Sequence, residues 1–478
     1  MSDNSMKTII KSEPSATSYN RDLCQVGVVH LGFGAFHRAH QAVYIDDFMD
    51  VSGDLRWGIA TVNLRSADTA NFEAAVADIA RHDGYFLRSH SADGGTELRR
   101  VRSHVKFADW TAKRDEAEAL LAEPSVHLVT ITVTESGYYT TTNGDLNLLD
   151  NTIKLETESD HKESVYSYLR SGLQKRMTDI DAPLTIACCD NIRQNGAMLQ
   201  RNMLAYLEAC NDTALHGWVE KNVAFPCSMV DRITPRSPSD LGLELSQLVG
   251  KDVASPIMSE DFMQWVLQDQ AAASLPDLAQ VGVTVTSDID PYEETKIRVL
   301  NGGHTALVYM AALEGIHTFD EAMRVPELNS HFFAFETKEV LPAITTDLPF
   351  SKETYLGKIE QRFANQAIGD TVARICADGM AKFSIFILPT IEGCLRQGVT
   401  PTFAIRSIAS WHQFARHVAA GNIDFEYIEP SWSTLEAMLG SDEFVTSSQI
   451  WGDIPETYPV FAEVLRQEIS EMETRWPV

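Results

Sequence analysis

The chain is poor in cysteine and in basic residues, and it has no long apolar run. Its seven cysteines are an odd number and include no Cys-x-x-Cys pair, which argues against a disulfide framework and against a structural zinc site. No apolar stretch approaches the roughly 20 residues that a membrane helix needs. Residues 1–21 are polar and lack an apolar export core, so we expect a flexible leader and a cytoplasmic protein.

The shortage of basic residues has a consequence for partners. The chain has 39 Lys and Arg against 67 Asp and Glu, a formal net charge of -28, and such a surface repels nucleic acid and anionic lipid. A neutral partner, or a small anion held in a local basic pocket, stays compatible with this charge. The length of 478 residues exceeds the usual size of one core, so we expect two domains.

The first half of the chain alternates between apolar runs and helical patterns. The run at 26–31 ends in Gly32-Phe33-Gly34 and leads into a helical pattern at 35–42, the opening of a βαβ unit. Further apolar strands are expected at 57–62, 126–133 and 184–189. This alternation predicts an α/β domain with a Rossmann-like, doubly wound parallel sheet over residues 22–287.

The pattern changes near Asp288. Long amphipathic stretches follow, for example at 305–314, 360–377 and 401–419, with few runs that suggest strands. The acidic tail from Pro455 also has the pattern of a helix with a solvated face. The sequence therefore predicts a second, mainly α-helical domain over residues 288–478.

The glycines after the first strand suit a dinucleotide. Gly32 permits the turn and Gly34 lets a pyrophosphate approach the backbone, but His37 stands where the third glycine of GxGxxG would be, so a structural turn fits equally well. After the second strand, Asp68 could bind the adenosine ribose, whereas Arg65 could receive a 2'-phosphate. We expect NAD as the cofactor.

The segment 292–304 gathers groups suited to proton transfer. If it is helical, Glu293, Lys296, Asn301 and His304 fall on an arc of about 140°. A solvated helix edge is the alternative interpretation. The Gly302-Gly303 pair argues against it, since two glycines cost a helix on the order of 1 kcal/mol each and close approach by a ligand or another backbone would explain them.

Two other segments carry polar groups after predicted strands. Asn191 follows the strand at 184–189, at the edge where ligands of α/β proteins gather, although a helix cap explains it as well. The segment 225–236 places Asp231, Arg232 and Arg236 between prolines. Its composition favours a structural loop held by an internal ion pair.

Taken together, these segments resemble the polyol-specific long-chain dehydrogenases, the mannitol 2-dehydrogenase family, from about Val26 almost to the end of the chain. The run Ser-Met-Val-Asp-Arg-Ile-Thr-Pro at 228–235 is similar to the family signature, and 30–40 is similar to its nucleotide turn. Residues 132–139 and 362–365 also resemble family segments. Within the family the chain is most similar to the D-arabinitol 4-dehydrogenases and mannitol 2-dehydrogenases, and less similar to the fructuronate and tagaturonate reductases.

The resemblance implies a zinc-independent enzyme of two domains that uses a nicotinamide cofactor. It implies that Lys296 is the general base and that Asn191 and Asn301 donate hydrogen bonds to the reacting oxygen. Glu293 is either a proton relay or an ion-pair partner of the lysine. The substrate hydroxyls would be held by His304, Asp231, Arg362 and Lys382, and the cofactor by Gly32, Phe33, Gly34, Arg65, Asp68 and Glu135. A lysine is a base only when neutral, which burial and nearby positive charge promote.

The sequence thus predicts an NAD-dependent oxidoreductase that interconverts a sugar alcohol of D-arabino configuration and its ketose. The pairs expected are D-mannitol with D-fructose or D-arabinitol with D-xylulose. One alternative is a hexuronate reductase of the same family, for which Lys382 or Arg193 could supply the extra cation. Another is a non-catalytic nucleotide-binding protein, against which Lys296, Asn301 and His304 argue. The preferred polyol, the direction and the oligomeric state stay open, and a monomer is compatible.

Overall fold

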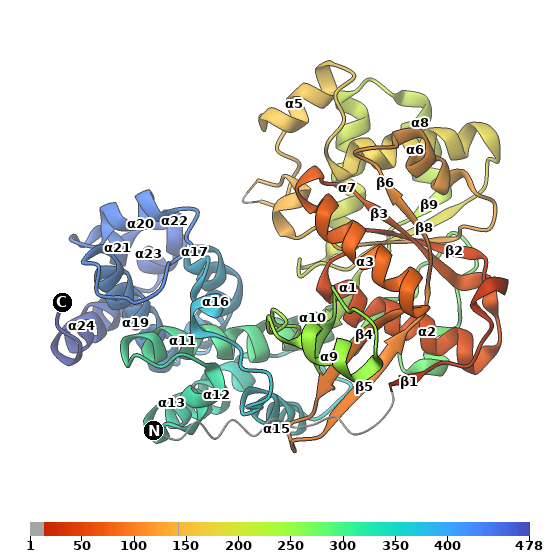
Figure 1. Ribbon diagram of the computed structural model, residues 1–478. Helices are drawn as coiled ribbons and strands as arrows, with labels where there is room; N and C mark the ends of the chain where they lie inside the picture. Colours follow the sequence, from red (N-terminus) through yellow and green to blue (C-terminus); the bar gives the residue numbers. More distant parts are fainter. Residues whose placement is uncertain (1–13, 142) are drawn as a thin grey trace. The chain divides into compact units, whose positions relative to one another are not determined.

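The computed structural model describes residues 14–141 and 143–478 and divides into two compact units (Figure 1). The first unit comprises the chain up to Ser91 together with Gly95–Ile289. The second comprises Ala92–Gly94 and Asp290–Val478. Each unit has hydrophobic clusters of its own.

A six-stranded parallel sheet forms the centre of the first unit. Its strands are β2 (Val26–Leu31), β3 (Gly58–Asn63), β6 (His104–Asp109), β7 (Leu128–Ile131), β8 (Leu184–Cys188) and β9 (Val223–Ala224). They lie in the order β6-β3-β2-β7-β8-β9, which in chain order is 3-2-1-4-5-6. This is the strand order of the Rossmann fold, so the predicted doubly wound sheet is confirmed, including the four strands expected from their apolar runs.

Both faces of this sheet are buried, which explains the nearly continuous apolar strands. Val29 and Leu31 belong to one hydrophobic cluster, and their neighbour Val28 belongs to the cluster on the opposite face. The helices of the unit are α1 (Ala35–Ala39), α2 (Gln41–Ser52), α3 (Thr69–His82), α4 (Arg114–Ala119), α5 (Asn151–Glu158), α6 (Val165–Asp179), α7 (Asn195–Ala209), α8 (Thr213–Asn222) and α9 (Leu241–Val249). Residues of α4, α6, α7 and α8 complete the first cluster, and residues of α2 and α3 contribute to the second.

Two smaller sheets were not predicted from the sequence. One has the order β1-β5-β4-β11, and the other has the order β10-β12-β13. Their short strands do not alternate with helices, so the βαβ pattern does not reveal them. The bounds are β1 (Ser15–Ala16), β4 (Tyr85–His90), β5 (Thr96–Val101), β10 (Ser228–Asp231), β11 (Ile257–Glu260), β12 (Gln264–Gln268) and β13 (Thr284–Thr286).

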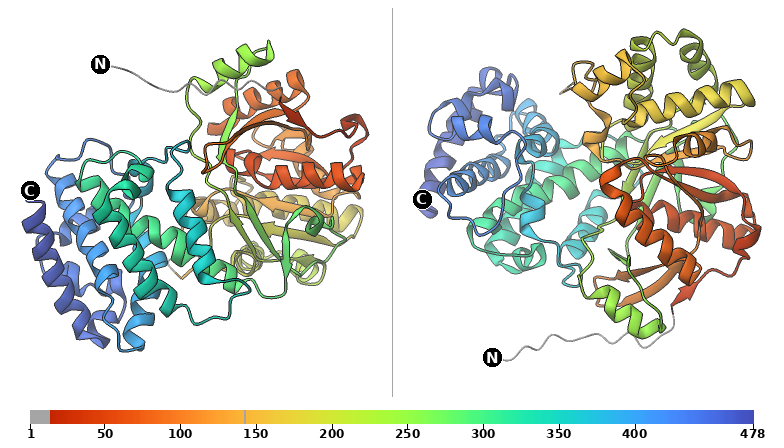
Figure 2. Two further views of the ribbon diagram at one scale, coloured as in Figure 1. Left: turned by 90° about the horizontal axis from the view of Figure 1, so that it is seen from below. Right: turned by 45° about the horizontal axis from the view of Figure 1, so that its top comes forward.

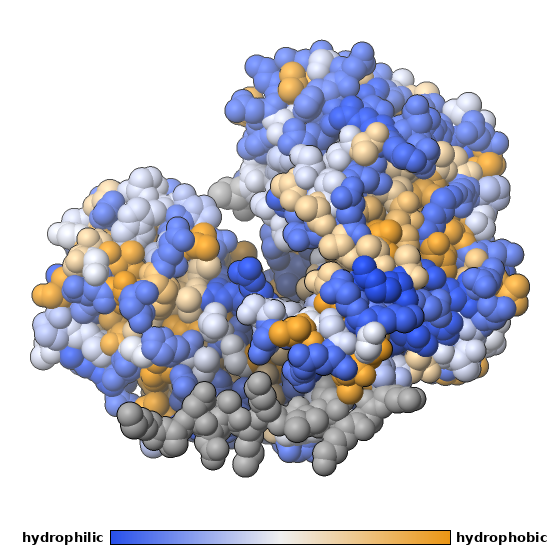
Figure 3. All heavy atoms as spheres, in the orientation of Figure 1, coloured by the Kyte–Doolittle hydropathy of each residue, from blue (hydrophilic) through white to orange (hydrophobic). Residues whose placement is uncertain are grey.

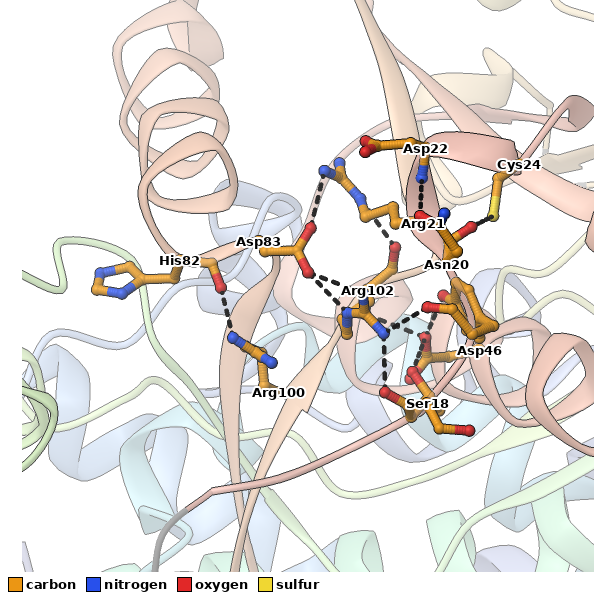
Figure 4. A network of polar contacts seen from close by, with 12 residues as sticks. Ser18, Asn20, Arg21, Asp22, Cys24, Asp46, His82, Asp83, Arg100 and Arg102 are labelled. Atoms are coloured by element: carbon orange, nitrogen blue, oxygen red, sulfur yellow. Dashed lines mark hydrogen bonds and ion pairs between the residues drawn. The ribbon is translucent and has the colours of Figure 1, made fainter.

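The predicted leader over residues 1–21 is wrong from Pro14 onward, and residues 1–13 lie outside the described part of the chain. The Tyr19 hydroxyl donates to Asp46 Oδ1 at 2.6 Å, and the Arg102 guanidinium donates to the carbonyl of Tyr19 at 3.0 Å. Figure 4 shows Arg21 and Arg102 both directed at the carboxylate of Asp83, at 3.4 and 2.8 Å. Polar partners, among them the buried Asp46 and Arg102, therefore fix this segment on the first unit.

The second unit is helical, as predicted. Its α-helices are α10 (Asp290–Thr295), α11 (Gly302–Leu313), α12 (Phe319–Arg324), α13 (Pro326–Phe335), α14 (Leu341–Ala343), α15 (Lys352–Phe363), α16 (Val372–Cys376), α17 (Gly379–Lys382), α18 (Leu388–Arg396), α19 (Thr402–Ala419), α20 (Trp432–Met438), α21 (Glu443–Thr446), α22 (Ser448–Trp451), α23 (Ile454–Thr457) and α24 (Pro459–Arg475). The π-helical segments η7 (Lys296–Asn301), η8 (Glu336–Val340) and η9 (Phe383–Ile387) lie between them. Helix α24 runs along α19 in both views of Figure 2.

Helix α11 is the core of this unit. It is buried on almost every side, so the amphipathic pattern expected at 305–314 is wrong and the helix is apolar all round. Within residues 14–141 and 143–478, no helix combines the length and apolarity of a membrane span. On the face drawn in Figure 3, hydrophilic residues cover most of both units, with apolar residues scattered between them.

The single helix expected at 360–377 is also wrong. Helix α15 ends at Phe363, Gly369 adopts a left-handed backbone with φ of 56°, and Thr371 then caps a new helix, α16, by accepting a hydrogen bond from Arg374 N–H. The tail of the chain from Pro455 is helical, as predicted, but it consists of two helices, α23 and α24. Pro459 lies in the first turn of α24, the position where proline starts a helix.

Candidate active site

A cavity of about 840 Å³ opens in the first unit where the strand order reverses, between β2 and β7. Ligands of doubly wound proteins bind at this point of the sheet. The cavity is lined by the glycine turn after β2, the ends of β3 and β7, and the segments around Arg236 and Ser255. The predicted cofactor residues Gly32, Phe33, Gly34, Arg65 and Asp68 all lie in its wall.

The two glycines of the turn have different roles. Gly32 has φ of 100°, and a β-carbon on it would lie 2.3 Å from the carbonyl oxygen of Thr132, so both the turn and the packing require glycine. A β-carbon on Gly34 would meet no atom within 4 Å. The backbone at Gly34 is therefore open to the cavity, as the approach of a pyrophosphate requires.

The charge of the cavity wall also suits a dinucleotide. Arg38, Arg65 and Arg236 line it, in a chain whose net charge is -28. Arg65 Nε lies 3.5 Å from Asp68 Oδ2, and both side chains are exposed. The wall thus offers cations for phosphates and one carboxylate at the position where a ribose would be recognised.

Asp190 holds the end of β7 in place. Its carboxylate accepts hydrogen bonds from Val133 N–H at 2.9 Å, Thr134 N–H at 3.2 Å and the Tyr138 hydroxyl at 2.7 Å. Burial raises the pKa of Asp190 to about 6. Sequence reasoning chose the neighbouring Asn191 and missed this clamp, because nothing in the pattern tells which residue of the pair turns inward.

Three further predicted residues of the first unit lie in two places. Asn191 is exposed in the loop between β8 and α7. Glu135 begins the short helical turn Glu135–Tyr138, is exposed, and does not line the 840 Å³ cavity. Arg193, the other spare cation, is exposed in the same loop as Asn191.

Asp231 is buried at the end of β10, so the loop expected over 225–236 is wrong for Ser228–Asp231. The strand pairs with β12, and Asp231 lies opposite Gln264. Arg232 donates from Nε to the Glu260 carbonyl at 2.9 Å and from Nη2 to Ser89 Oγ at 3.0 Å. Strand pairing and these bonds fix the segment.

In the second unit, the helical run 290–313 contains a π-helical turn, η7 (Lys296–Asn301). Its end is marked by the hydrogen bond from Gly302 N–H to the Ile297 carbonyl, five residues back. In an α-helix Lys296 and Asn301 would be about 140° apart, whereas the wider i→i+5 turn of a π-helix lessens that angle. The regular α-helical arc expected from the sequence is therefore wrong for Lys296–Asn301, and the π-turn brings the two side chains closer to one face.

The glycine pair after the turn is explained by packing within the unit. A β-carbon on Gly303 would lie 2.7 Å from the Phe332 ring and 3.0 Å from Glu336 Oε1, and one on Gly302 would lie 3.2 Å from the Phe386 carbonyl. Neighbouring side chains and one backbone carbonyl, all from the second unit, thus exclude larger residues. The glycines let the start of α11 pass close to these groups.

The turn that carries Lys296 is buried and fixed by Arg298. Lys296 is 6% exposed and Glu293 is 4% exposed. Arg298 donates to Glu294 Oε1 at 2.8 Å, to Thr390 Oγ1 at 3.2 Å and to the Ala343 carbonyl at 3.2 Å. One side chain of the π-turn is therefore tied to three other segments.

His304 lies between two aromatic rings and close to three cations. Its ring stacks on Phe363 at 4.1 Å and meets Phe319 edge-on at 4.5 Å. Burial, and then the positive charges of Arg374, Arg362 and Lys382, hold the pKa of His304 well below its usual value. A neutral imidazole among cations can accept a hydrogen bond from a hydroxyl.

The sequence did not predict Arg374 as a residue near His304. It pairs with Asp370 four residues before it, and Lys382 donates to the Ile375 carbonyl at 2.7 Å. In the continuous helix expected over 360–377, Arg362 and Arg374 would point about 120° apart. The break between α15 and α16 allows both to act on His304, and no periodicity could reveal it.

Among the described residues, no cluster of three or more His, Cys, Asp or Glu side chains is arranged to hold a metal ion.

Comparison with known proteins agrees with this architecture. Residues 26–280 match the family model for the mannitol dehydrogenase Rossmann domain, and residues 288–472 match the model for the mannitol dehydrogenase C-terminal domain. In three dimensions the chain is similar to mannitol 2-dehydrogenase of Pseudomonas fluorescens, solved as a ternary complex with NAD and D-mannitol. The TM-score is 0.86 at 30% identity, over 96% of this chain and 94% of that one.

Curated relatives of several specificities are similar along nearly their whole length. Mannitol 2-dehydrogenase of Cereibacter sphaeroides is 32% identical, over 93% of this chain and 94% of its own. D-arabinitol 4-dehydrogenase of Klebsiella pneumoniae is 31% identical, over 93% and 98%. Polyol:NADP oxidoreductase of Gluconobacter oxydans is 29% identical, over 93% of each. With both family models matched in order and a dinucleotide cavity at the switch point of its sheet, the chain belongs to the mannitol dehydrogenase family of polyol oxidoreductases.

Proposed function

We propose that the protein is an NAD-dependent polyol dehydrogenase that interconverts a sugar alcohol of D-arabino configuration and its ketose. D-mannitol with D-fructose, or D-arabinitol with D-xylulose, are the substrate pairs. The observation that carries this proposal is the π-turn Lys296–Asn301, which buries Lys296 and supports a base and a hydrogen-bond donor at its two ends. The relatives that act on mannitol and arabinitol support the substrate class.

Oxidation of a secondary alcohol requires removal of a hydroxyl proton and stabilisation of the carbonyl dipole that develops. The bound cofactor supplies the acceptor for the hydride. Lys296 accepts the hydroxyl proton as general base, and the amides of Asn301 and Asn191 donate hydrogen bonds to the same oxygen. In ketose reduction the protonated lysine returns that proton.

The other substrate hydroxyls are held by His304, Asp231, Arg362 and Lys382. Neutral His304 accepts from one hydroxyl, and the cations donate to others. Arg374, which lies close enough to affect the pKa of His304, joins this set. Such a group of directional donors and acceptors distinguishes the configuration of a polyol from that of its epimers.

Glu293 is the exit for the proton taken up by Lys296. It lies one turn before the lysine, in α10, and is as buried as the lysine itself. A carboxylate at this position can accept a proton from the lysine and deliver it to water.

NAD is the preferred cofactor because of Asp68. Its carboxylate stands in the cavity wall, where it can accept from ribose hydroxyls and repel a 2'-phosphate. Its pairing with Arg65 also engages the cation that would otherwise attract that phosphate.

A hexuronate reductase is the second candidate, favoured by one observation. Three cations act on His304, and a substrate carboxylate would find a partner among them. Arg374 is paired with Asp370, whereas Lys382 donates to a neutral backbone carbonyl, so Lys382 is the cation for this role.

A substrate panel separates the candidates. NADH formation is measured with D-mannitol, D-arabinitol and D-sorbitol, and NADH oxidation with D-fructose, D-xylulose, fructuronate and tagaturonate, each with and without a metal chelator. We expect turnover with one or more of the D-arabino polyols and their ketoses, unaffected by chelation since Lys296 supplies the base. Turnover with the hexuronates alone would overturn the proposal in favour of the second candidate, and no turnover with any substrate would favour a non-catalytic protein.

A further inference from the structure

The place of the missing third glycine is filled by a stack of histidine rings. The rings of His37 on α1 and His30 on β2 lie face to face, with centroids 3.2 Å apart and planes within 8°. Both residues are fully buried. In the usual GxGxxG turn, the third glycine lets the helix pack directly against the strand. Here two imidazole rings lie between them instead.

Hydrogen bonds connect the His30 ring of this stack to the end of β7. His30 Nδ1 lies 2.8 Å from Thr130 Oγ1, and His30 Nε2 lies 3.0 Å from Thr132 Oγ1, both at the end of β7. Thr132 is also the residue whose carbonyl lies against Gly32. His30 therefore fixes the residue that sets the position of the first glycine.

The other ring fixes α1. His37 Nε2 is 3.0 Å from Nε2 of His104, a buried residue at the start of β6, and His37 Nδ1 is 3.3 Å from Gln41 Oε1. A bond between two ring nitrogens needs one donor and one acceptor. With His37 Nδ1–H donating to Gln41, His104 Nε2–H donates to His37 Nε2, and both rings are neutral.

Burial keeps the rings in this neutral state. It lowers the pKa of His37 to about 3 and holds the pKa values of His30 and His104 well below their usual value. The hydrogen bond to Gln41 acts to raise the pKa of His37, whereas Arg38 and His40 lower it further. The stack thus contributes geometry and no charge to the cavity.

The register of α1 also decides where Arg38 points. Arg38 follows His37, lies over the Phe33 ring at 5.1 Å, and donates from Nη1 to Ser255 Oγ at 2.9 Å. Arg38, Phe33 and Ser255 all line the cavity. A shift of α1 would therefore move a cation of the cavity wall together with the glycine turn.

We propose that His37, stacked on His30 and bonded to His104, is a positioning residue that holds the Gly32–Gly34 turn and Arg38 in the geometry that binds the cofactor pyrophosphate. The ring stack takes over the function of the third glycine. This inference rests on the dinucleotide cofactor alone and is independent of the polyol and of the role of Lys296.

The decisive variant is His37→Gly, which completes the GxGxxG spacing. If a third glycine were the better solution, the variant would bind NADH as tightly as the wild type or more tightly. We expect instead that the NADH dissociation constant, measured by fluorescence titration without substrate, rises at least about tenfold, as for lost buried hydrogen bonds and packing. His37→Phe keeps a flat ring and should lose less affinity than His37→Gly.

Two further variants separate positioning from loss of fold. His412→Ala removes a buried neutral histidine from the second unit, where its Nε2 contacts the Leu439 carbonyl, so it should lower the melting temperature and leave NADH affinity unchanged. Thr130→Val removes only the hydroxyl bonded to His30 Nδ1 and does not line the cavity. It should weaken NADH binding roughly threefold or more. Wild-type NADH affinity in His37→Gly, or in Thr130→Val if His37→Gly does not fold, would overturn the proposal.

Discussion

At the level of a single residue, the proposed preference for NAD depends on Asp68. It faces the cavity and pairs with Arg65 at 3.5 Å, so it both repels a 2'-phosphate and engages the nearest cation. Asp68→Ala should lower the ratio of kcat/KM with NAD to that with NADP by roughly fivefold, because an exposed charge contributes about 1 kcal/mol.

Arg65→Ala is the matched variant for this prediction, since it removes the opposite charge of the same pair. It should leave NAD kinetics nearly unchanged and depress use of NADP further. Both ratios are obtained from initial rates with a fixed polyol. A wild-type enzyme that prefers NADP, or an Asp68→Ala variant with an unchanged ratio, would contradict this account of cofactor choice.

Individual residues were predictable where their chemistry follows a recognisable element. Gly32, Gly34, Arg65 and Asp68 come directly after strands, so the apolar runs located them, and all four line the cavity. Asp190 and Arg374 were missed for a physical reason. The direction of Asp190 depends on the backbone of β7, and Arg374 reaches His304 only because the helix at 360–377 is broken.

At the scale of elements, the π-turn η7 is the feature that hydrophobic periodicity cannot supply. The spacing of apolar residues indicates which positions are buried. A π-turn is instead a local change of backbone hydrogen bonding, and it changes the angle around the helix axis between the side chains of Lys296 and Asn301. The break between α15 and α16 and the two small sheets were missed because capping at Thr371 and strand pairing both depend on distant contacts.

Arg298 should stabilise the π-turn more than an ordinary helical ion pair does. It is 4% exposed and bonds Glu294, Thr390 and the Ala343 carbonyl. Arg298→Met should lower the free energy of unfolding in urea by about 3 kcal/mol, the usual cost of breaking a buried pair. It should also lower kcat, because Lys296 and Asn301 lose their alignment.

Arg396→Met is the control for this variant. Arg396 pairs with Glu392 at 3.4 Å, again four residues apart in the second unit, but both side chains are exposed. Its loss should change stability by less than about 1 kcal/mol and leave kcat unchanged. Equal effects of the two substitutions would show that the π-turn does not depend on Arg298.

At the scale of the whole molecule, buried histidines make the fold sensitive to acid. Burial lowers the pKa of seven histidines among the described residues, so below about pH 6.5 the unfolded chain binds protons that the folded chain does not. Five carboxyls with raised pKa values, Asp46, Asp190, Glu336, Glu339 and Asp378, act in the opposite direction.

Because the histidines outnumber these carboxyls, the free energy of unfolding should decrease as the pH falls from 6.5 to 5. Each neutral buried histidine contributes up to about 1.4 kcal/mol per pH unit. Urea unfolding at several pH values tests this, and His37→Phe should flatten the slope by about one proton. A stability that stays level or increases on acidification would contradict the assignment of neutral rings.

The architecture of the whole chain was predictable because its signals are local and repeated. Apolar strands alternate with helices in the first unit, and that pattern with the glycine turn predicts a doubly wound parallel sheet. The strand order and the strands β6 and β9 were not predicted, because they depend on contacts between distant segments. The helical second unit was predictable from periodicity, but the exact course of its chain was not, since α11 is apolar all round and leaves no amphipathic signal.

The central claim is that Lys296 is the general base of polyol oxidation. The most direct test compares the pH–rate profiles of Lys296→Ala and of a control, Lys358→Ala. Lys358 is an exposed lysine on α15. Positioned acid–base catalysis contributes about 10² to 10⁴ in rate, so Lys296→Ala should lose at least that order while binding NADH normally. The wild type and Lys358→Ala should oxidise polyol faster as the pH rises and reduce ketose more slowly, because oxidation needs the neutral amine and reduction the protonated one. Near wild-type turnover of Lys296→Ala with the same pH profile would contradict the account and leave Glu293 or His304 as the base.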